Sequence, residues 1–267
     1  QMCIRDRQIH IFNKNDFSYL TSIGNFGEGP EEITVMGCLA IDEAHHQLYV
    51  SDHAKQKIFS YDMDSVMVDS LYKPQVKTAM NETLFPSEYQ YINDTLSIAV
   101  LIKPTSTSTF NQFLGRWNMN TGEMIPMKYT HPDIQKKRIT FAASEKAGIY
   151  VECYTRHDLM TICSLDGELL YNIYGPDWDG GNGNKLQSFG TVMIGNDKIF
   201  VSYCGEDYAR DSFPTKILVF DLEGNYLKTL ETGYKISDCC YDSFNNRIIL
   251  SLNDVVQFAY LDIDGII

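Results

Sequence analysis

The chain has 267 residues, of which 44% are hydrophobic and 21% are charged, so it can build a core and is too apolar for a disordered polypeptide. Its 22 Lys and Arg residues against 35 Asp and Glu residues give a formal net charge of −13. That charge would be repelled by a nucleic-acid backbone or an anionic membrane surface, so neither is expected as a partner.

The first residues do not fit the rest of the sequence. Residues 1–7 are short and polar, and they lack the apolar stretch of a signal peptide. The segment from Met2 to Arg7 is similar to the adapter-derived tails of fragments translated from metagenomic assemblies. We therefore expect residues 1–7 to be a non-native tail and any export signal to be missing. No run approaches the ~18 apolar residues of a membrane helix, so no transmembrane segment is expected.

A repeating unit begins immediately after this tail. It consists of an apolar strand, a tight polar turn and a second strand, and several turns contain Asp-Gly, Glu-Gly or Thr-Gly, which supply the positive φ of a hairpin. Its six copies are centred at Asp16, Asp64, Gly122, Gly167, Gly224 and Gly265. A second hairpin precedes most copies, at residues 38–50, 89–100, 139–151, 190–201 and 239–250.

Two hairpins make four short antiparallel strands in roughly 40–58 residues, which is the size of a propeller blade. The sequence therefore predicts an all-β fold, a six-bladed β-propeller of four-stranded antiparallel blades. Residues 8–267 would form this single domain, with five nearly complete blades. The first blade would be incomplete, because residues 9–24 supply only two strands, so the propeller is expected to be N-terminally truncated. No segment has long helical periodicity.

Two segments resemble a known family. Residues 48–58, LYVSDHAKQKI, resemble the NHL-repeat signature of a strand, an Asp-led turn and a basic residue before the next strand. Residues 23–33, IGNFGEGPEEI, resemble the Gly-rich loop that precedes each such repeat. The chain is thus similar to the bacterial TolB-like six-bladed propellers. The resemblance implies an exported or lipid-anchored protein, in the periplasm or at the cell surface, and little about chemistry.

The cysteines suggest neither a metal site nor a disulfide framework. The seven residues are an odd set without a C-x-x-C motif. Five of them lie in apolar strand-like runs, where we expect buried thiols: Cys38, Cys153, Cys163, Cys204 and Cys239.

Loop length indicates which face of the propeller could bind a partner. The turns between strands one and two, and between strands three and four, are tight, as at Asn93-Asp94 and Asp166-Gly167. The loops between strands two and three and between blades lie on the opposite face. Long loops are often functional, and the long ones fall in this second set, at residues 72–88, 103–109, 174–187 and 203–215.

Two of these loops carry residue types common at binding sites. The loop at 174–187 presents Asp177, Trp178 and Asp179 on a Gly- and Asn-rich frame, and the loop at 203–215 presents Tyr208 beside Arg210. Exposed Trp, Tyr and Arg are frequent anchors of interfaces. We predict that these five residues bind the partner, together with a sixth from the two-to-three loop of the first full blade, His53. The alternative is that Trp178 packs over a blade edge and the charges are solvated.

Metal sites are less well supported. Four residues of one loop carry oxygen ligands that Ca²⁺ could use: Asp177, Asp179, Asn182 and Asn184. However, Gly181 occupies the third ligand position of the D-x-[DN]-x-[DN]-G pattern. His45 and His46 fall in a different loop type from His53, so they would lie on opposite faces. We therefore expect no cofactor.

These observations favour a monomeric, non-catalytic binding or scaffold propeller that recognises a protein or glycan partner through its long-loop face. The acidic residues on that face favour a neutral or cationic partner. The alternative is a calcium-dependent hydrolase or lactonase with a metal in the central channel. Glu88, Asn93 and Asp238 are candidate ligands for it but form no legible set, and the chain has no G-x-S-x-G nucleophile motif.

Overall fold

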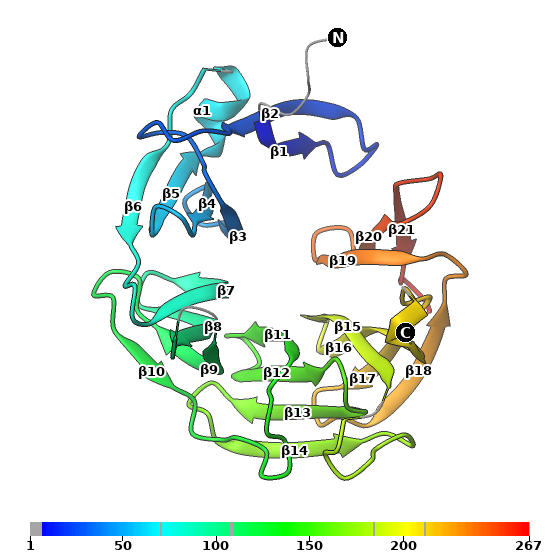
Figure 1. Ribbon diagram of the computed structural model, residues 1–267. Helices are drawn as coiled ribbons and strands as arrows, with labels where there is room; N and C mark the ends of the chain where they lie inside the picture. Colours follow the sequence, from blue (N-terminus) through cyan, green and yellow to red (C-terminus); the bar gives the residue numbers. More distant parts are fainter. Residues whose placement is uncertain (1–6, 70, 107–108, 184, 211, 267) are drawn as a thin grey trace. The chain divides into compact units, whose positions relative to one another are not determined.

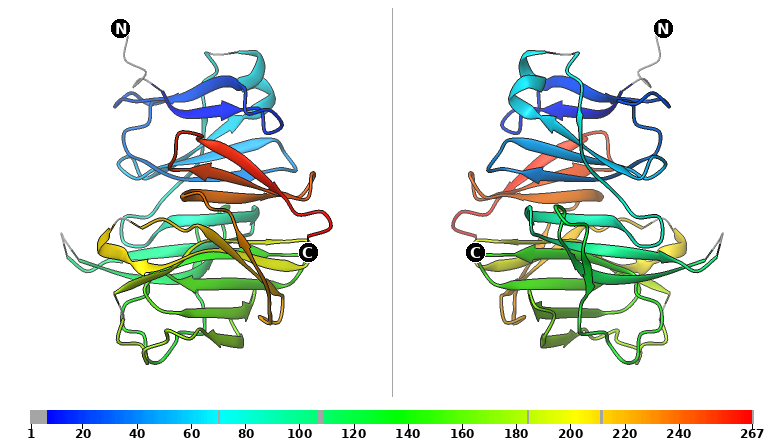
Figure 2. Two further views of the ribbon diagram at one scale, coloured as in Figure 1. Left: turned by 90° about the vertical axis from the view of Figure 1, so that its right-hand side faces the viewer. Right: turned by 90° about the vertical axis from the view of Figure 1, so that its left-hand side faces the viewer.

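The computed structural model describes residues 7–69, 71–106, 109–183, 185–210 and 212–266, apart from the side chain of Tyr208. These residues form two compact units that divide between Pro126 and Met127. Each unit is a series of antiparallel sheets (Figures 1 and 2).

The first unit contains three sheets. A two-stranded sheet is followed by two four-stranded sheets, and in each the sequence neighbours pair antiparallel. The strands of the first sheet are β1 (Arg7–Phe12) and β2 (Tyr19–Asn25). Those of the second are β3 (Met36–Asp42), β4 (Gln47–Asp52), β5 (Lys57–Asp62) and β6 (Gln75–Ala79). Those of the third are β7 (Phe85–Asn93), β8 (Leu96–Pro104), β9 (Phe110–Trp117) and β10 (Met124–Pro126).

The second unit also contains three sheets, two of four strands and one of three. The first consists of β11 (Ile139–Ser144), β12 (Ile149–Tyr154), β13 (Leu159–Ser164) and β14 (Leu169–Tyr174). The second consists of β15 (Leu186–Gly195), β16 (Lys198–Asp207), β17 (Lys216–Asp221) and β18 (Tyr226–Glu231). The third consists of β19 (Ile236–Asp242), β20 (Arg247–Leu252) and β21 (Phe258–Asp262).

This organisation confirms the predicted fold class, an all-β propeller of four-stranded antiparallel blades. Within the described residues, four sheets have four strands, one has three and one has two. The two-stranded sheet contains the two strands that the repeat predicts at residues 9–24.

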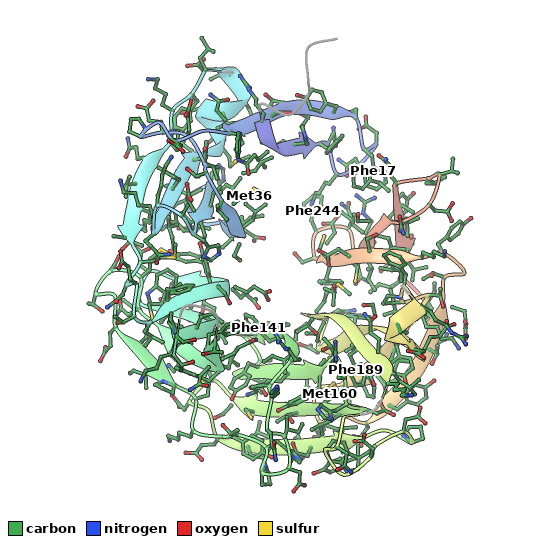
Figure 3. The ribbon with its side chains drawn as sticks, in the orientation of Figure 1. Phe17, Met36, Phe141, Met160, Phe189 and Phe244 are labelled. Carbon is green, nitrogen blue, oxygen red and sulfur yellow. The ribbon has the colours of Figure 1, made fainter. Side chains whose placement is uncertain are left out.

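The cores of both units lie between neighbouring sheets. In the second unit, residues of β12 and β13 pack against residues of β15 and β16, among them Met160 and Phe189 (Figure 3). All six residues of β12 are buried. A strand buried on both faces needs apolar residues at consecutive positions, and β12 supplies them in Ile149, Tyr150 and Val151.

The outer edge of the first four-stranded sheet differs from the prediction. The repeat predicts a hairpin centred at Asp64, but this residue lies in the helix α1 (Met63–Val68). Asp62 caps the helix by accepting a hydrogen bond from the Ser65 N–H. The expected long loop at residues 72–88 is also wrong, because it contains β6 and the start of β7. The reason is physical: β6 has no buried residue, so its sequence carries no burial pattern. The loop expected at residues 203–215 is shorter than predicted, because β16 continues to Asp207.

The thiols are only partly as expected. Cys153, Cys163 and Cys239 are buried, whereas Cys38 and Cys204 are half-buried; these five and the exposed Cys240 are free thiols. Burial raises the pKa of Cys163 to about 11 and that of Cys239 to about 12, so both remain protonated and unreactive at neutral pH.

The NHL-like motif has a structural role in the first unit. The buried carboxylate of Asp52 accepts hydrogen bonds from four backbone N–H groups, those of Thr34, Val35, Ala54 and Lys55. Burial alone would raise the pKa of Asp52, but these donors hold it below its usual value. The Lys55 ammonium donates to the carbonyls of Gly29, at 2.6 Å, and of Gly27, so it fixes the Gly-rich loop before β3.

The helices in the described residues are short. The α-helix has six residues, and a 3₁₀ turn, η1, covers Tyr208–Arg210. Neither approaches the length of a membrane-spanning helix.

Candidate functional site

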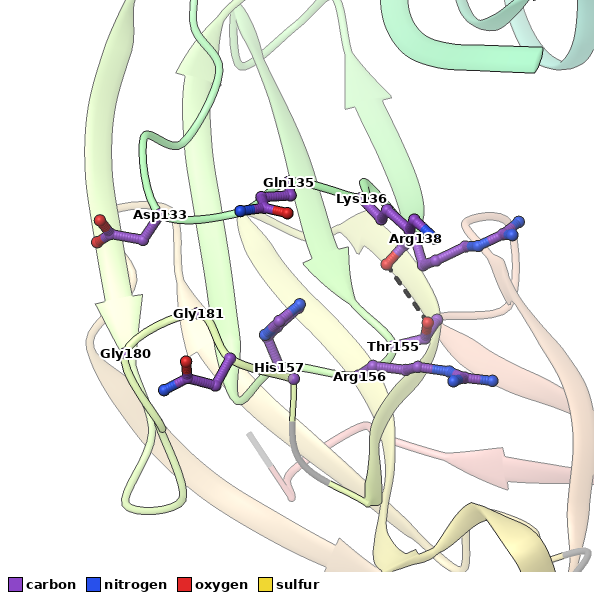
Figure 4. A pocket seen from close by; sticks show the side chains of 11 residues that line it. Asp133, Gln135, Lys136, Arg138, Thr155, Arg156, His157, Gly180 and Gly181 are labelled. Atoms are coloured by element: carbon purple, nitrogen blue, oxygen red, sulfur yellow. Dashed lines mark hydrogen bonds between the residues drawn. The ribbon is translucent and has the colours of Figure 1, made fainter. Parts of the chain in front are cut away.

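An open cleft of about 880 Å³ lies in the second unit (Figure 4). Three segments line it: residues 133–138 before β11, residues 155–157 between β12 and β13, and residues 180–183 between β14 and β15. The first and third segments connect blades, and the second joins strands two and three of one blade. The cleft therefore lies at the end of the blades where the topology places the long loops.

The charge of the cleft is opposite to that of the chain. Its lining contains three permanent cations, Lys136, Arg138 and Arg156, and a single carboxylate, Asp133. All four side chains belong to exposed residues. The cleft therefore does not fit the expectation of a neutral or cationic partner, because it would attract an anion.

The segment that carries Lys136 and Arg138 is held in place by contacts with the strand β12 and the residue that follows it. Lys137, between them, points inward and forms an ion pair of 2.6 Å with Glu152 of β12. Glu152 is fully buried and also accepts a hydrogen bond from the Tyr154 hydroxyl. The carbonyl of Arg138 accepts a hydrogen bond from the backbone N–H of Thr155 (Figure 4 draws the contact between these two residues). This wall is thus positioned by the blade and not by a free loop.

An aromatic cluster lies beside the cleft. The Trp178 ring contacts His131, His157 and Tyr174, with ring centroids 5.5, 6.0 and 5.0 Å apart. His131 Nδ1 accepts the Asp133 backbone N–H, so its Nε2–H donates to the Tyr174 hydroxyl at 3.0 Å. Trp178 is only half-buried and does not line the cleft. It supports His157, which does.

His157 is the buried polar group of the cleft. It is 7% exposed, and its ring points into the space between residues 135–138 and residues 180–183 (Figure 4). Nδ1 lies 3.9 Å from Asp179 Oδ1, too far for a hydrogen bond, and neither atom has another hydrogen-bond partner among the described residues. Burial lowers the pKa of His157, although Asp179 opposes this shift, so the ring is neutral at pH 7.

Glycines allow the third wall to approach the rest of the unit. Gly181 has a φ of +83°, and a Cβ there would lie 2.4 Å from the carbonyl oxygen of Asp133. A Cβ on Gly175 would lie 2.1 Å from the carboxylate of Asp158, which accepts the backbone N–H of Asp177. Close packing therefore requires glycine at Gly175 and Gly181.

The structure brings together part of the predicted site. Trp178 and Asp179 both lie against His157, and Asp177 begins the same loop. Arg210 is exposed at the end of η1 and does not line the cleft, and the side chain of Tyr208 lies outside the described residues.

His53 belongs to the first unit and is not part of this cluster. Its ring is half-buried and packs against Phe85, with centroids 6.0 Å apart, and a Cβ on Gly37 would collide with it. Burial lowers the pKa of His53. Its observed contacts indicate a packing role.

Sequence reasoning missed the cations and the second histidine. The signal was present as two short basic runs in an acidic chain, at residues 136–138 (KKR) and 156–157 (RH). The first run lies in the connection of residues 127–138, which the sequence analysis did not count among the long loops, and the second lies in the short connection between β12 and β13. Loop length therefore did not reveal them.

The described residues contain no group of three or more His, Cys, Asp and Glu side chains placed to hold a metal. Of the calcium candidates, Asn184 lies outside the described residues, and the Asn182 amide donates to the Asp179 carbonyl at 2.7 Å. The channel candidates are divided, because Glu88 and Asn93 belong to β7 in the first unit and Asp238 to β19 in the second.

The histidines make stability depend on pH. We expect the free energy of unfolding to fall as the pH drops from 7.5 to 5.5. Burial lowers the pKa of His131, of His157 and of His53 in the folded chain, whereas unfolded histidines titrate near 6.5. Below that pH the unfolded state binds more protons, so acid favours unfolding, by about 1.4 kcal/mol for each unit of pKa lowering.

Urea unfolding at several pH values measures this effect. Replacing His131 or His157 with Gln should flatten the dependence. A stability that stays constant between pH 7.5 and 5.5 would contradict the neutral, buried state of these rings.

Comparisons with known proteins agree on the fold. A family model described as a 6-bladed β-propeller matches residues 4–116, less than half of the chain. A protein of unknown function from Bacteroides caccae has a TM-score of 0.55 at 12% identity, over 97% of this chain and 87% of that chain. The extracellular domain of BT4673, named as a one-component system, from B. thetaiotaomicron has a TM-score of 0.54 at 14% identity, over 87% of this chain and 28% of that chain.

A search of curated proteins finds no match. The similarities to solved structures are below 25% identity, so they show the β-propeller fold and do not identify a ligand. They do not reach the narrower TolB-like or NHL-repeat assignment, which stays a prediction.

Proposed function

We propose that this chain is a non-catalytic binding propeller and that the cleft beside His157 holds its ligand. The observation that carries the proposal is a cleft lined by cations whose wall contains the buried ring of His157. The Nδ1 atom of this ring has no hydrogen-bond partner among the described residues. Ligand sites are typically concave, of about 300–1,000 Å³, with a few convergent polar groups.

The shape of the site favours a glycan over a protein surface. Protein–protein interfaces are usually broad, burying about 800 Å² on each partner. A recess of about 880 Å³ between three backbone segments instead suits an oligosaccharide of a few units. We therefore favour the glycan of the two partner classes that the sequence leaves open.

The predicted residues enter this proposal in two roles. Trp178 and Asp179 lie against the ring of His157. The backbone N–H of Asp177 donates to the carboxylate of Asp158 and so holds the first part of their loop. Arg210, which is exposed and outside the cleft lining, stays a proposed further contact. Tyr208 stays a prediction, because its side chain lies outside the described residues. For the intact protein we propose a monomeric, exported, TolB-like propeller of the periplasm or cell surface; the extracellular location of the BT4673 domain supports this placement.

A blocked cleft tests the proposal. Asn182 is exposed in the cleft wall, and a Trp side chain there would fill the recess. Wild-type protein is screened against a panel of oligosaccharides by thermal shift, because a ligand that binds only the folded state raises its stability. We expect Asn182→Trp to abolish the shift of every hit and mass spectrometry to recover the saccharides unchanged.

Asn253→Trp is the matched control, because Asn253 is an exposed residue of the same unit outside the cleft. The thermal shift of Trp178→Ala then measures how much the packing of Trp178 on His157 contributes to binding. That of Arg210→Ala measures the contribution of the proposed contact outside the cleft. If a saccharide still raises the thermal stability of Asn182→Trp, the binding site lies outside the cleft. If the recovered saccharides are cleaved, the protein is an enzyme.

A further inference from the structure

Two of the three cations that line the cleft are not paired with acidic side chains of the described residues. Lys136 and Arg138 form no ion pair with any described carboxylate, although the chain has an excess of acidic residues. Lys137, the residue between them, shows the contrast, since it is buried in its pair with Glu152. An exposed cation pair without a carboxylate partner is available to a ligand.

The third cation comes from a different segment. Arg156 lies in the turn between β12 and β13, while Arg138 directly precedes β11, and the Thr155–Arg138 hydrogen bonds hold these segments together. The side chains of Arg138 and Arg156 extend toward the same side of the cleft (Figure 4). Two guanidinium groups on one side form a site suited to a carboxylate or sulfate, because their forked donors match such anions.

The uncharged part of the lining is also polar. Gln135, Thr155 and Asn182 supply amide and hydroxyl groups, which can both donate and accept hydrogen bonds, and the glycines between them leave the backbone accessible. None of the described lining residues has an aliphatic or Phe, Tyr or Trp side chain. The side chains of the lining are therefore predominantly polar, and a ligand with anionic groups on a hydroxyl-rich body would match them.

We propose that the ligand is an acidic saccharide, whose carboxylate or sulfate group binds between Arg138 and Arg156 while its hydroxyls face Gln135, Thr155 and Asn182. This inference rests on the proposed function, because it takes the cleft as the ligand site. A neutral glycan would leave Lys136 and Arg138 without a carboxylate or sulfate partner. An acidic peptide is disfavoured because peptide recognition commonly uses apolar pockets for side chains, and the lining provides none.

Isothermal titration with matched saccharides tests the proposal. The probes are a tetrameric oligogalacturonate, the same tetramer as its methyl ester, and a carrageenan tetrasaccharide, which carries sulfate groups and no carboxylate. We expect an acidic probe to bind and the ester to bind at least tenfold more weakly, with affinity falling as salt rises. The first and third probes distinguish a carboxylate from a sulfate.

Variants then locate the anion. Arg138→Gln and Arg156→Gln should each weaken the acidic probe about tenfold or more, which corresponds to about 1.4 kcal/mol of binding free energy. Lys235→Gln, which removes an exposed cation of the same unit outside the cleft, should leave the affinity unchanged.

The outcomes separate this inference from the proposed function. If ester and acid bind equally and Asn182→Trp blocks both, the cleft is the site but the acidic class is wrong. If a Glu-rich peptide binds in place of the saccharides, the glycan assignment is wrong. If an acidic probe binds and Asn182→Trp does not affect it, both proposals are overturned, as they are if no saccharide or peptide binds.

Discussion

Replacing Lys137 with Met is expected to lower the free energy of unfolding by about 3–5 kcal/mol, the usual cost of removing one partner from a buried ion pair. Lys137 is 9% exposed and Glu152 is fully buried, with 2.6 Å between their charged atoms. The substitution keeps the aliphatic length of the side chain, so the loss comes from the uncompensated carboxylate of Glu152. Urea unfolding measures it.

A double variant identifies the cause. In Lys137→Met with Glu152→Leu neither charge is buried, so most of the stability should return. Lys136→Met, at the exposed neighbouring position, should hardly change stability. If the double variant is less stable than Lys137→Met alone, the loss would come from packing and not from charge.

The same pair determines the geometry of the cleft. It fixes the wall that carries Lys136 and Arg138 to the centre of a blade. Lys137→Met should therefore also weaken binding of the acidic saccharide under conditions where the variant is still folded. Lys136→Met should weaken binding without the loss of stability, which distinguishes a ligand contact from a support.

Asp52→Ala is expected to have an effect of similar size in the first unit. It would leave four backbone N–H donors without their acceptor and the Lys55 ammonium without its nearby carboxylate, 3.8 Å away. An unsatisfied buried donor costs about 1–3 kcal/mol, and some of these groups can reach water. We therefore expect a loss of about 3–5 kcal/mol on urea unfolding.

Asp52→Asn provides the graded comparison, since the amide keeps one oxygen acceptor and loses the charge. It should be intermediate between the wild type and Asp52→Ala. The hydrogen exchange of the Thr34 and Val35 amides, which bond to Asp52, should accelerate in the same order. Equal stability of all three proteins would contradict a structural role for the motif.

The blade repeat could be predicted because its signals are local. Asn196 and Asp197 have φ values of 49° and 55° in the turn between β15 and β16, a conformation typical of Asn, Asp and Gly. The strand β12, buried on both faces, has a continuous apolar run. The strand β6 has neither signal, because it lies exposed at the edge of its sheet, and so it was mistaken for a loop.

The candidate site was predicted only in part, for a related reason. Trp178 and Asp179 stand in a long Gly-rich loop, which is visible in the sequence. His131 and His157 are 26 positions apart, and contact between them and Trp178 depends on the packing of three connections of one blade. Loop length cannot reveal a contact of that kind.

The distribution of charge also could not be predicted from the sequence, although the net charge could. The sequence by itself determined an antiparallel β-propeller of an acidic chain, because turn residues and strand burial act over a few neighbouring positions. Only the tertiary structure decided that Lys136, Arg138 and Arg156 gather in one cleft while Lys137 turns inward to Glu152. Adjacent residues point to opposite sides of the backbone, and their environment is set by segments distant in the chain.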